Sequence, residues 1–89
     1  MSKPFDLSAL RGKLGLDQAQ MAERMGLDAR DYVELEASPG QVQRRHAMLA
    51  HLASLDVAIE RGEPSLASST MREKILAWHL LQMAQDQNA

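Results

Sequence analysis

Apolar and polar residues alternate with a helical period along most of this chain, and the pattern is clearest in its N-terminal third. There, Met21, Ala22 and Met25 fall on one side of a short helix predicted over residues 18–25. Gly26 follows at once, where the helix has to stop and turn, and glycine adopts the positive φ of such a turn at little cost. The small side chain of Ala22 suits a point where two helices cross closely. The pattern therefore predicts a short helix that ends in a tight turn.

A second short helix is predicted directly after this turn, over residues 29–36. Tyr32 and Leu35 give it an inward face at i, i+3 spacing. Asp17 and Asp28 stand just before the two helices, where a carboxylate accepts hydrogen bonds from free backbone N–H groups. Two short helices joined by a glycine turn in this way are typical of a helix-turn-helix.

Two further helices are expected around this motif. Asp6 or Ser8 can cap a first helix that runs through Lys13 and ends at Gly15. A long helix is expected to begin at Pro39 and to continue without a break through residue 61. Its cap would be the hydroxyl of Ser38, and its large apolar residues keep helical spacing at Val42, Leu49, Leu52, Leu55 and Ile59. Gly62, Pro64 and the segment SLASS then form a polar connector.

The last helix is expected from about Met71 to Ala84, opened by a capping box at Thr70 and Glu73. Its apolar residues fall on two stripes, one of Met71, Ile75, Trp78 and Leu81 and one of Leu76, Leu80 and Met83. Such a helix either packs back across the small domain, or lets one stripe meet the domain and the other a second copy. We expect the second arrangement, with Trp78 as an anchor, because two-fold dimers are the commonest oligomers. The five predicted helices make the chain all-α.

Positions between residues 6 and 55 also agree with a family pattern, at Leu10, Arg11, Leu14, Gly15, Leu16, Gln18, Met21, Ala22, Met25, Gly26, Leu27, Tyr32 and Glu36. At these residues the chain resembles the Xre/Cro-type helix-turn-helix family, whose domains have a lambda-repressor-like fold. The resemblance implies sequence-specific binding to double-stranded DNA, as a homodimer on a palindromic operator, with the second motif helix in the major groove. Residues 1–62 would then form the DNA-binding domain. Residues 63–89 would form a connector and a dimerisation helix within the same compact domain, with the interface at Met71, Ile75, Trp78 and Leu81.

The resemblance also assigns residues to the DNA surface. The base contacts fall to Ala29, Arg30, Val33 and Glu34. An arginine can bond to guanine in bidentate fashion, apolar side chains can contact the methyl group of thymine, and a glutamate can accept from cytosine. The resemblance assigns phosphate contacts to Gln18, Arg11, Lys13, Arg44 and Arg45, with Gln18 at the start of the first motif helix. Each of these basic residues is equally compatible with an ordinary solvated surface.

The charge of the second motif helix departs from the family pattern. The chain has a formal net charge of −2, and Asp28, Asp31, Glu34 and Glu36 accompany the single Arg30 on this helix. Carboxylates near phosphates weaken DNA binding unless each finds a donor or a cation. Asp28 is explained as a cap, and Glu36 tends to bond internally in the family. The alternative function is therefore a protein-binding module, an antiactivator or antirepressor that docks on another regulator through this acidic helix.

Composition and spacing exclude several other classes. The chain has no cysteine, which excludes thiol catalysis and Cys-based zinc sites and fits a reducing cytoplasm. It has no 18-residue apolar run and no secretory signal, so we expect a cytoplasmic protein with no membrane partner. His46 and His51 project in different directions from one helix and are expected at the surface, and no HExxH motif or glycine-rich phosphate loop occurs. We therefore expect a small transcriptional repressor that needs no metal or cofactor and is not an enzyme.

Overall fold

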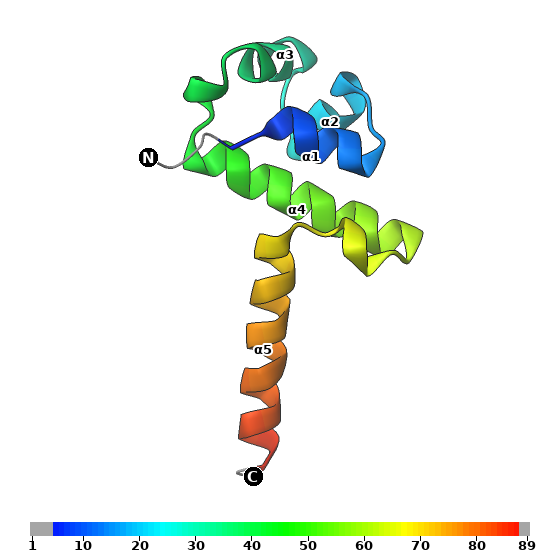
Figure 1. Ribbon diagram of the computed structural model, residues 1–89, viewed down its shortest axis with the longest axis vertical. Helices are drawn as coiled ribbons and strands as arrows, with labels where there is room; N and C mark the ends of the chain where they lie inside the picture. The colour runs from blue at the N-terminus through cyan, green and yellow to red at the C-terminus, as the bar shows by residue number, and fades with distance from the viewer. Residues whose placement is uncertain (1–4, 88–89) are drawn as a thin grey trace.

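The computed structural model describes residues 5–87, and in that range the chain forms five α-helices and two 3-10 turns without any strand. The helices are α1 (Leu7–Leu14), α2 (Gln18–Met25), α3 (Ala29–Ala37), α4 (Arg44–Arg61) and α5 (Ser69–Gln87), and the turns are η1 (Pro39–Gln41) and η2 (Pro64–Leu66). Helices α1, α2 and α3 lie on one side of α4, and α5 extends from the other side (Figure 1). The expected all-α class is confirmed. No helix in the described range is both long enough and apolar enough to cross a bilayer.

The ends of α2 and α3 are formed by the residues expected from the sequence. The carboxylate of Asp17 accepts a hydrogen bond from the N–H of Gln20 at 2.7 Å, and that of Asp28 accepts one from the N–H of Arg30 at 2.8 Å. Gly26 has a φ of 72°, in the left-handed region. Residues with a side chain rarely adopt this conformation, so glycine allows the sharp turn between the two helices.

The core lies between α4 and the three N-terminal helices. Its buried apolar cluster is Leu7, Leu14, Leu16, Met21, Ala22, Met25, Tyr32, Leu35, Ala50, Ala53 and Val57. Helix α4 contributes small side chains, Ala50, Ala53 and Val57, which lets the other helices approach it closely. Of the large apolar residues with helical spacing, Val42 and Leu49 pack against this core, whereas Leu52 and Ile59 mark a different face of α4, where they are 51% and 69% exposed.

Helix α4 begins later than the sequence predicted. Ser38 makes no capping hydrogen bond with its side chain, and Pro39–Gln41 form the separate turn η1. The helix begins at Arg44, where the N–H of Gln43 donates to Nδ1 of His46 at 3.0 Å. His46 is buried, so its expected place at the surface was wrong.

Helix α5 also begins and ends at residues other than those predicted. It begins at Ser69, and the hydroxyl of Ser68 accepts a hydrogen bond from the N–H of Met71 at 3.3 Å. The expected cap, Thr70, lies inside the helix. The helix continues to Gln87, three residues beyond the predicted Ala84. The predicted start was wrong because Ser68 is held by Ser54 and His51 of α4, which are distant in sequence.

A buried network of hydrogen bonds joins α4 to the start of α5. The N–H of Ser68 donates to Oγ of Ser54 at 2.9 Å, and that hydroxyl donates to the carbonyl of His51 at 2.6 Å. Nδ1 of His51 lies 2.8 Å from Oγ of Ser68, and the ring of Phe5 meets the imidazole edge-on. Ser54 is fully buried and Ser68 nearly so. These bonds fix the direction in which α5 leaves α4.

Acidification from about pH 7.5 to about pH 5.5 is expected to loosen this junction. Burial lowers the pKa of His51 below its ordinary value of 6.5, so the folded state favours the neutral ring. Its contribution to stability is complete above pH 6.5 and is lost as the pH falls through the lower folded pKa, where the ring becomes charged beside the buried Ser68. Amide hydrogen exchange of α5 measures the effect. His51→Gln, which does not titrate, is the control, and an equal change in that variant would contradict the assignment.

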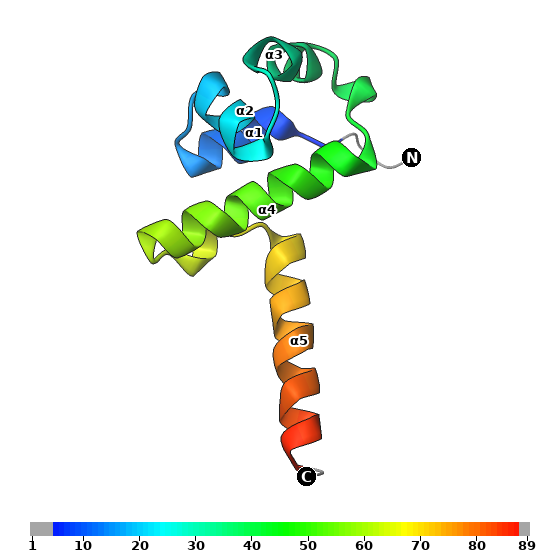
Figure 2. The same ribbon diagram turned by 180° about the vertical axis from the view of Figure 1, so that it is seen from behind.

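Helix α5 does not pack back across the other helices. It extends away from them along the longest axis of the molecule, as both views agree (Figures 1 and 2). Every residue from 72 to 86 is exposed. Exposed large side chains occur on both stripes, with Ile75, Trp78 and Leu81 on one and Leu76, Leu80 and Met83 on the other. The packing-back interpretation is therefore wrong, and neither stripe is covered by the rest of the domain.

Candidate nucleic-acid interface

The four residues assigned to base contacts lie together on the outward face of α3. Ala29, Arg30, Val33 and Glu34 are all exposed. At 100° per residue they occupy an arc of about 140°, and the buried face of the same helix lies opposite this arc. The face combines one guanidinium, one carboxylate and two small apolar side chains, and it begins at the N-terminus of the helix, which is capped by Asp28.

The carboxylate of Glu36 holds α3 against α1 and α2. Oε1 of Glu36 accepts from Nε of Arg11 at 2.6 Å and from the hydroxyl of Tyr32 at 3.0 Å. Oε2 accepts from Nε2 of Gln18 at 2.9 Å. Arg11 belongs to α1 and Gln18 is the first residue of α2, so one carboxylate connects the three N-terminal helices. We name Arg11, Gln18, Tyr32 and Glu36 the Glu36 cluster.

The Glu36 cluster is ionised and well satisfied at neutral pH. Burial by itself would raise the pKa of Glu36, but hydrogen bonds from Arg11, Gln18 and Tyr32 outweigh burial and bring the pKa below its ordinary value. The hydrogen bond to Glu36 raises the pKa of Arg11, and burial raises the pKa of the Tyr32 hydroxyl. The side chain of Glu36 is only 7% exposed. Charge and hydrogen bonds therefore fix the orientation of α3 relative to its neighbours.

The residues assigned to phosphate contacts fall into two groups. Arg11 and Gln18 are engaged inside the Glu36 cluster, and Nη1 of Arg11 also donates to the carbonyl of Leu16 at 3.1 Å. Lys13, Arg44 and Arg45 are exposed, the first near the end of α1 and the other two at the start of α4. Arg11 and Gln18 thus act within the protein as supports of α3, whereas the other three project from its surface.

The acidic residues of α3 do not all lie on its outward face. Asp28 caps the helix, and Glu36 is bonded internally. Asp31 lies about 60° beyond the edge of the outward arc. It lines, together with Glu34 and Arg45, a hollow of about 380 Å³ between α3 and the start of α4. The outward face itself carries Arg30 and Glu34, so its charge is closer to neutral than the sequence of the helix indicated.

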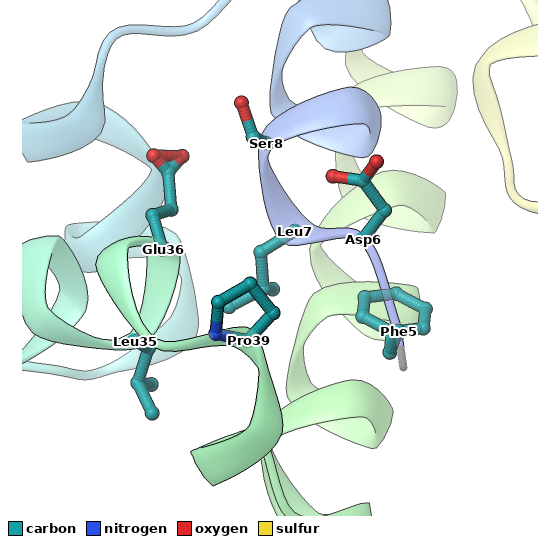
Figure 3. A pocket seen from close by; sticks show the side chains of 7 residues that line it. All are labelled: Phe5, Asp6, Leu7, Ser8, Leu35, Glu36 and Pro39. Atoms are coloured by element: carbon teal, nitrogen blue, oxygen red, sulfur yellow. The ribbon is translucent and has the colours of Figure 1, made fainter. Parts of the chain in front are cut away.

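A second hollow, of about 310 Å³, lies between the start of α1 and the end of α3 (Figure 3). Its charged side chains, among the described residues that line it, are those of Asp6 and Glu36. Asp6 accepts from the N–H of Ala9 at 2.9 Å and thereby caps α1, and Glu36 is bonded within its cluster. Both carboxylates in this hollow therefore have structural partners.

Comparisons with known proteins add no family assignment. No family model matches the chain, and neither a search of curated proteins nor a search of solved structures found a match.

Proposed function

We propose that this protein is a small sequence-specific DNA-binding regulator, a cytoplasmic homodimeric repressor whose helix α3 enters the major groove of its operator. Helices α2 and α3 would form a helix-turn-helix of the Xre/Cro type within a lambda-repressor-like domain. The observation that carries the proposal is the outward face of α3, which is exposed and is held in a fixed orientation by the Glu36 cluster. A rigid helix with exposed side chains on one face is the element that fits a major groove.

The chemistry of this face suggests how bases would be distinguished. The guanidinium of Arg30 can donate two hydrogen bonds to O6 and N7 of guanine. Ala29 and Val33 offer methyl groups to thymine, and Glu34 can accept from N4 of cytosine. Because Arg30 provides the only positive charge on the face, it is the residue on which specificity depends most.

Phosphate contacts would come from the residues around α3. Lys13, Arg44 and Arg45 are exposed cations. The free N–H groups at the start of α2 offer a further site for a phosphate oxygen. With so few cations and a net charge of −2, the binding should weaken only modestly with added salt.

The test is a binding titration with duplex DNA from upstream of the protein's own gene, with random duplex as competitor. Arg30→Ala is expected to cost about 1–3 kcal/mol of specific binding and to relax the preference at one base pair. Arg61→Ala, which removes the same charge at the far end of α4, is the matched control and should leave the preference intact. Specific binding that survives Arg30→Ala unchanged would contradict the assignment of α3.

The alternative function is a protein-binding module, and the exposed carboxylates Asp31 and Glu34 are the observation that favours it. These side chains could dock on a basic surface of another regulator. The same titration separates the two functions. No binding to any duplex at micromolar protein in low salt would favour the protein-binding alternative.

A further inference from the structure

The outer face of α4 carries an uncovered apolar stripe. Met48, Leu52, Leu55 and Ile59 recur at intervals of three and four residues, on the side opposite to the buried face. Met48, Leu52 and Ile59 are 54%, 51% and 69% exposed, and Leu55 is half-buried. Contiguous exposed apolar surface of this kind marks an interaction site. We name these four residues the outer stripe.

The chain's own α5 leaves the outer stripe open. The bonds of Ser68 to Ser54 and His51 direct α5 away from α4, as the two views show (Figures 1 and 2). Between the two helices lies a groove of about 480 Å³. Leu55, Ala58 and Ile59 line its α4 side, and Ile75, Leu76 and His79 line its α5 side. The groove is therefore mainly apolar and open to a further helix.

Helix α5 has the surface that such a groove requires. Residues 75–85 contain no Asp, Glu, Lys or Arg, so about three turns of the helix lack a permanent charge. Six large apolar side chains on α5 are 46–60% exposed. A helix that is apolar on most of its circumference is normally buried, and one partner on one side does not suffice to bury it.

We propose that a second copy packs against this groove, with its α5 helix parallel to the first copy's α5 and the first turns of that helix near the outer stripe of α4. The first copy's α5 packs against the partner's groove in the same way, so each chain supplies both the groove and its occupant. The outer stripe and residues 75–85 of α5 contain no Asp, Glu, Lys or Arg, which favours this occupant over a charged partner.

The number of residues that a stable dimer interface needs also indicates that the outer stripe takes part. A stable interface takes about 20–30 residues from each side. Helix α5 has 19 residues, and a single helix–helix contact uses only part of its circumference. The outer stripe supplies the additional surface, so pairing of α5 helices alone would give a smaller contact than a stable dimer needs.

The parallel direction rests on the proposed function. Helix α3 and the C-terminal end of α5 lie at opposite ends of the longest axis, which measures 51 Å (Figure 1). A two-fold axis parallel to α5 keeps both α3 helices at the same end of the dimer, whereas an antiparallel pair puts them at opposite ends. Only the first arrangement presents both α3 helices to one straight duplex.

Single cysteines near the end of α5 test the direction without DNA. The chain has no cysteine of its own, and Gln82→Cys, Met83→Cys, Ala84→Cys and Gln85→Cys together sample the whole circumference of the helix. A disulfide needs Cα atoms within about 7 Å. A parallel pair gives an inter-chain disulfide in at least one of these variants after mild oxidation. If none forms a disulfide, but a cysteine at residue 84 crosslinks to one near residue 74 in a mixture, the parallel arrangement is overturned.

A charge on the outer stripe tests whether this stripe takes part in the dimer. Leu52→Glu is expected to weaken dimerisation at least tenfold in sedimentation velocity, although residue 52 is outside α5. Met48→Glu is a second variant at an exposed position, and circular dichroism verifies that each variant is folded. Val33→Glu makes a similar change on α3 and should leave dimerisation unchanged. Dimerisation unaffected by Leu52→Glu and Met48→Glu would overturn the proposal, as would a wild-type chain that stays monomeric. These readouts need no DNA, so their failure is distinct from failure to bind an operator.

Discussion

Replacement of Glu36 by alanine is expected to lower the free energy of unfolding by about 3 kcal/mol, because it removes the acceptor of three side chains at once. Arg11, Gln18 and Tyr32 would each lose a partner, and the Tyr32 hydroxyl would be left in the core without one. Removal of one member of a buried pair costs more than the pair contributes, since the remaining group stays desolvated. Denaturant unfolding followed by circular dichroism measures the change.

The same prediction has a pH dependence with a defined sign. The pKa of Glu36 is lowered in the folded state, so its contribution to stability is present above the ordinary value of 4.5 and is lost as the pH falls through the folded value. The difference in stability between wild type and Glu36→Ala should therefore be constant near neutrality and should shrink below about pH 4.5.

Two variants provide controls for the Glu36 prediction. Glu36→Gln keeps the shape of the side chain and part of its hydrogen bonding, so it should cost less than alanine. Glu34→Ala removes the same side chain from an exposed position on the same helix and should change stability by no more than about 0.5 kcal/mol. If Glu36→Ala were as mild as Glu34→Ala, the Glu36 cluster would not hold α3 in place.

The local features of the fold could be predicted from the sequence. Asp17 and Asp28 cap their helices, and Gly15 and Gly26 end helices with positive φ. Each of these features depends on backbone groups within a few residues, so the residue type and its position contain the information. Tyr32 and Leu35 are buried for a related reason, because an apolar pair at i, i+3 spacing has one inward face.

The inward face of α4 could not be predicted from its large apolar residues. Size ordinarily marks the core, but the close approach of the other helices to α4 leaves room only for side chains such as Ala50, Ala53 and Ser54. The helical spacing of these small residues could have indicated which face of α4 is buried. Because these small residues face the core, Leu52 and Ile59 face outward. Their exposure supports the proposed contact with a second copy.

The features missed at the site depend on contacts between residues far apart in the chain. Arg11 and Glu36 are 25 positions apart, and their ion pair follows only once α1 and α3 are placed side by side. The resemblance indicated an internal role for Glu36 but did not identify Arg11 and Gln18 as its hydrogen-bond donors, and their contacts to phosphates stay a prediction. Ser68 appeared as part of a polar connector, whereas its burial against α4 makes it the cap of α5. Sequence spacing predicts such roles poorly because it contains no tertiary distances.

Trp78→Glu is expected to abolish the dimer and to weaken binding to the full operator by about 10²–10⁴-fold. Trp78 is 60% exposed, so the substitution leaves the core of the chain intact. It places a charge within the uncharged surface of α5, where association would have to bury that charge without a partner. Each monomer would then bind its half-site alone and would lose the high effective concentration that a second linked site provides.

Two measurements on the same sample separate this effect from misfolding. Light scattering gives the oligomeric state, and fluorescence anisotropy compares a full operator with an isolated half-site. The full operator should lose affinity, whereas the half-site should bind wild type and Trp78→Glu almost equally, because α3 and its Glu36 cluster lie at the other end of the molecule (Figure 1). Ser65→Glu, which adds the same charge at an exposed position of η2, should change neither result. A Trp78→Glu variant that remains dimeric would exclude Trp78 from the interface, and a monomer with undiminished affinity for the full operator would show that DNA binding does not require the dimer.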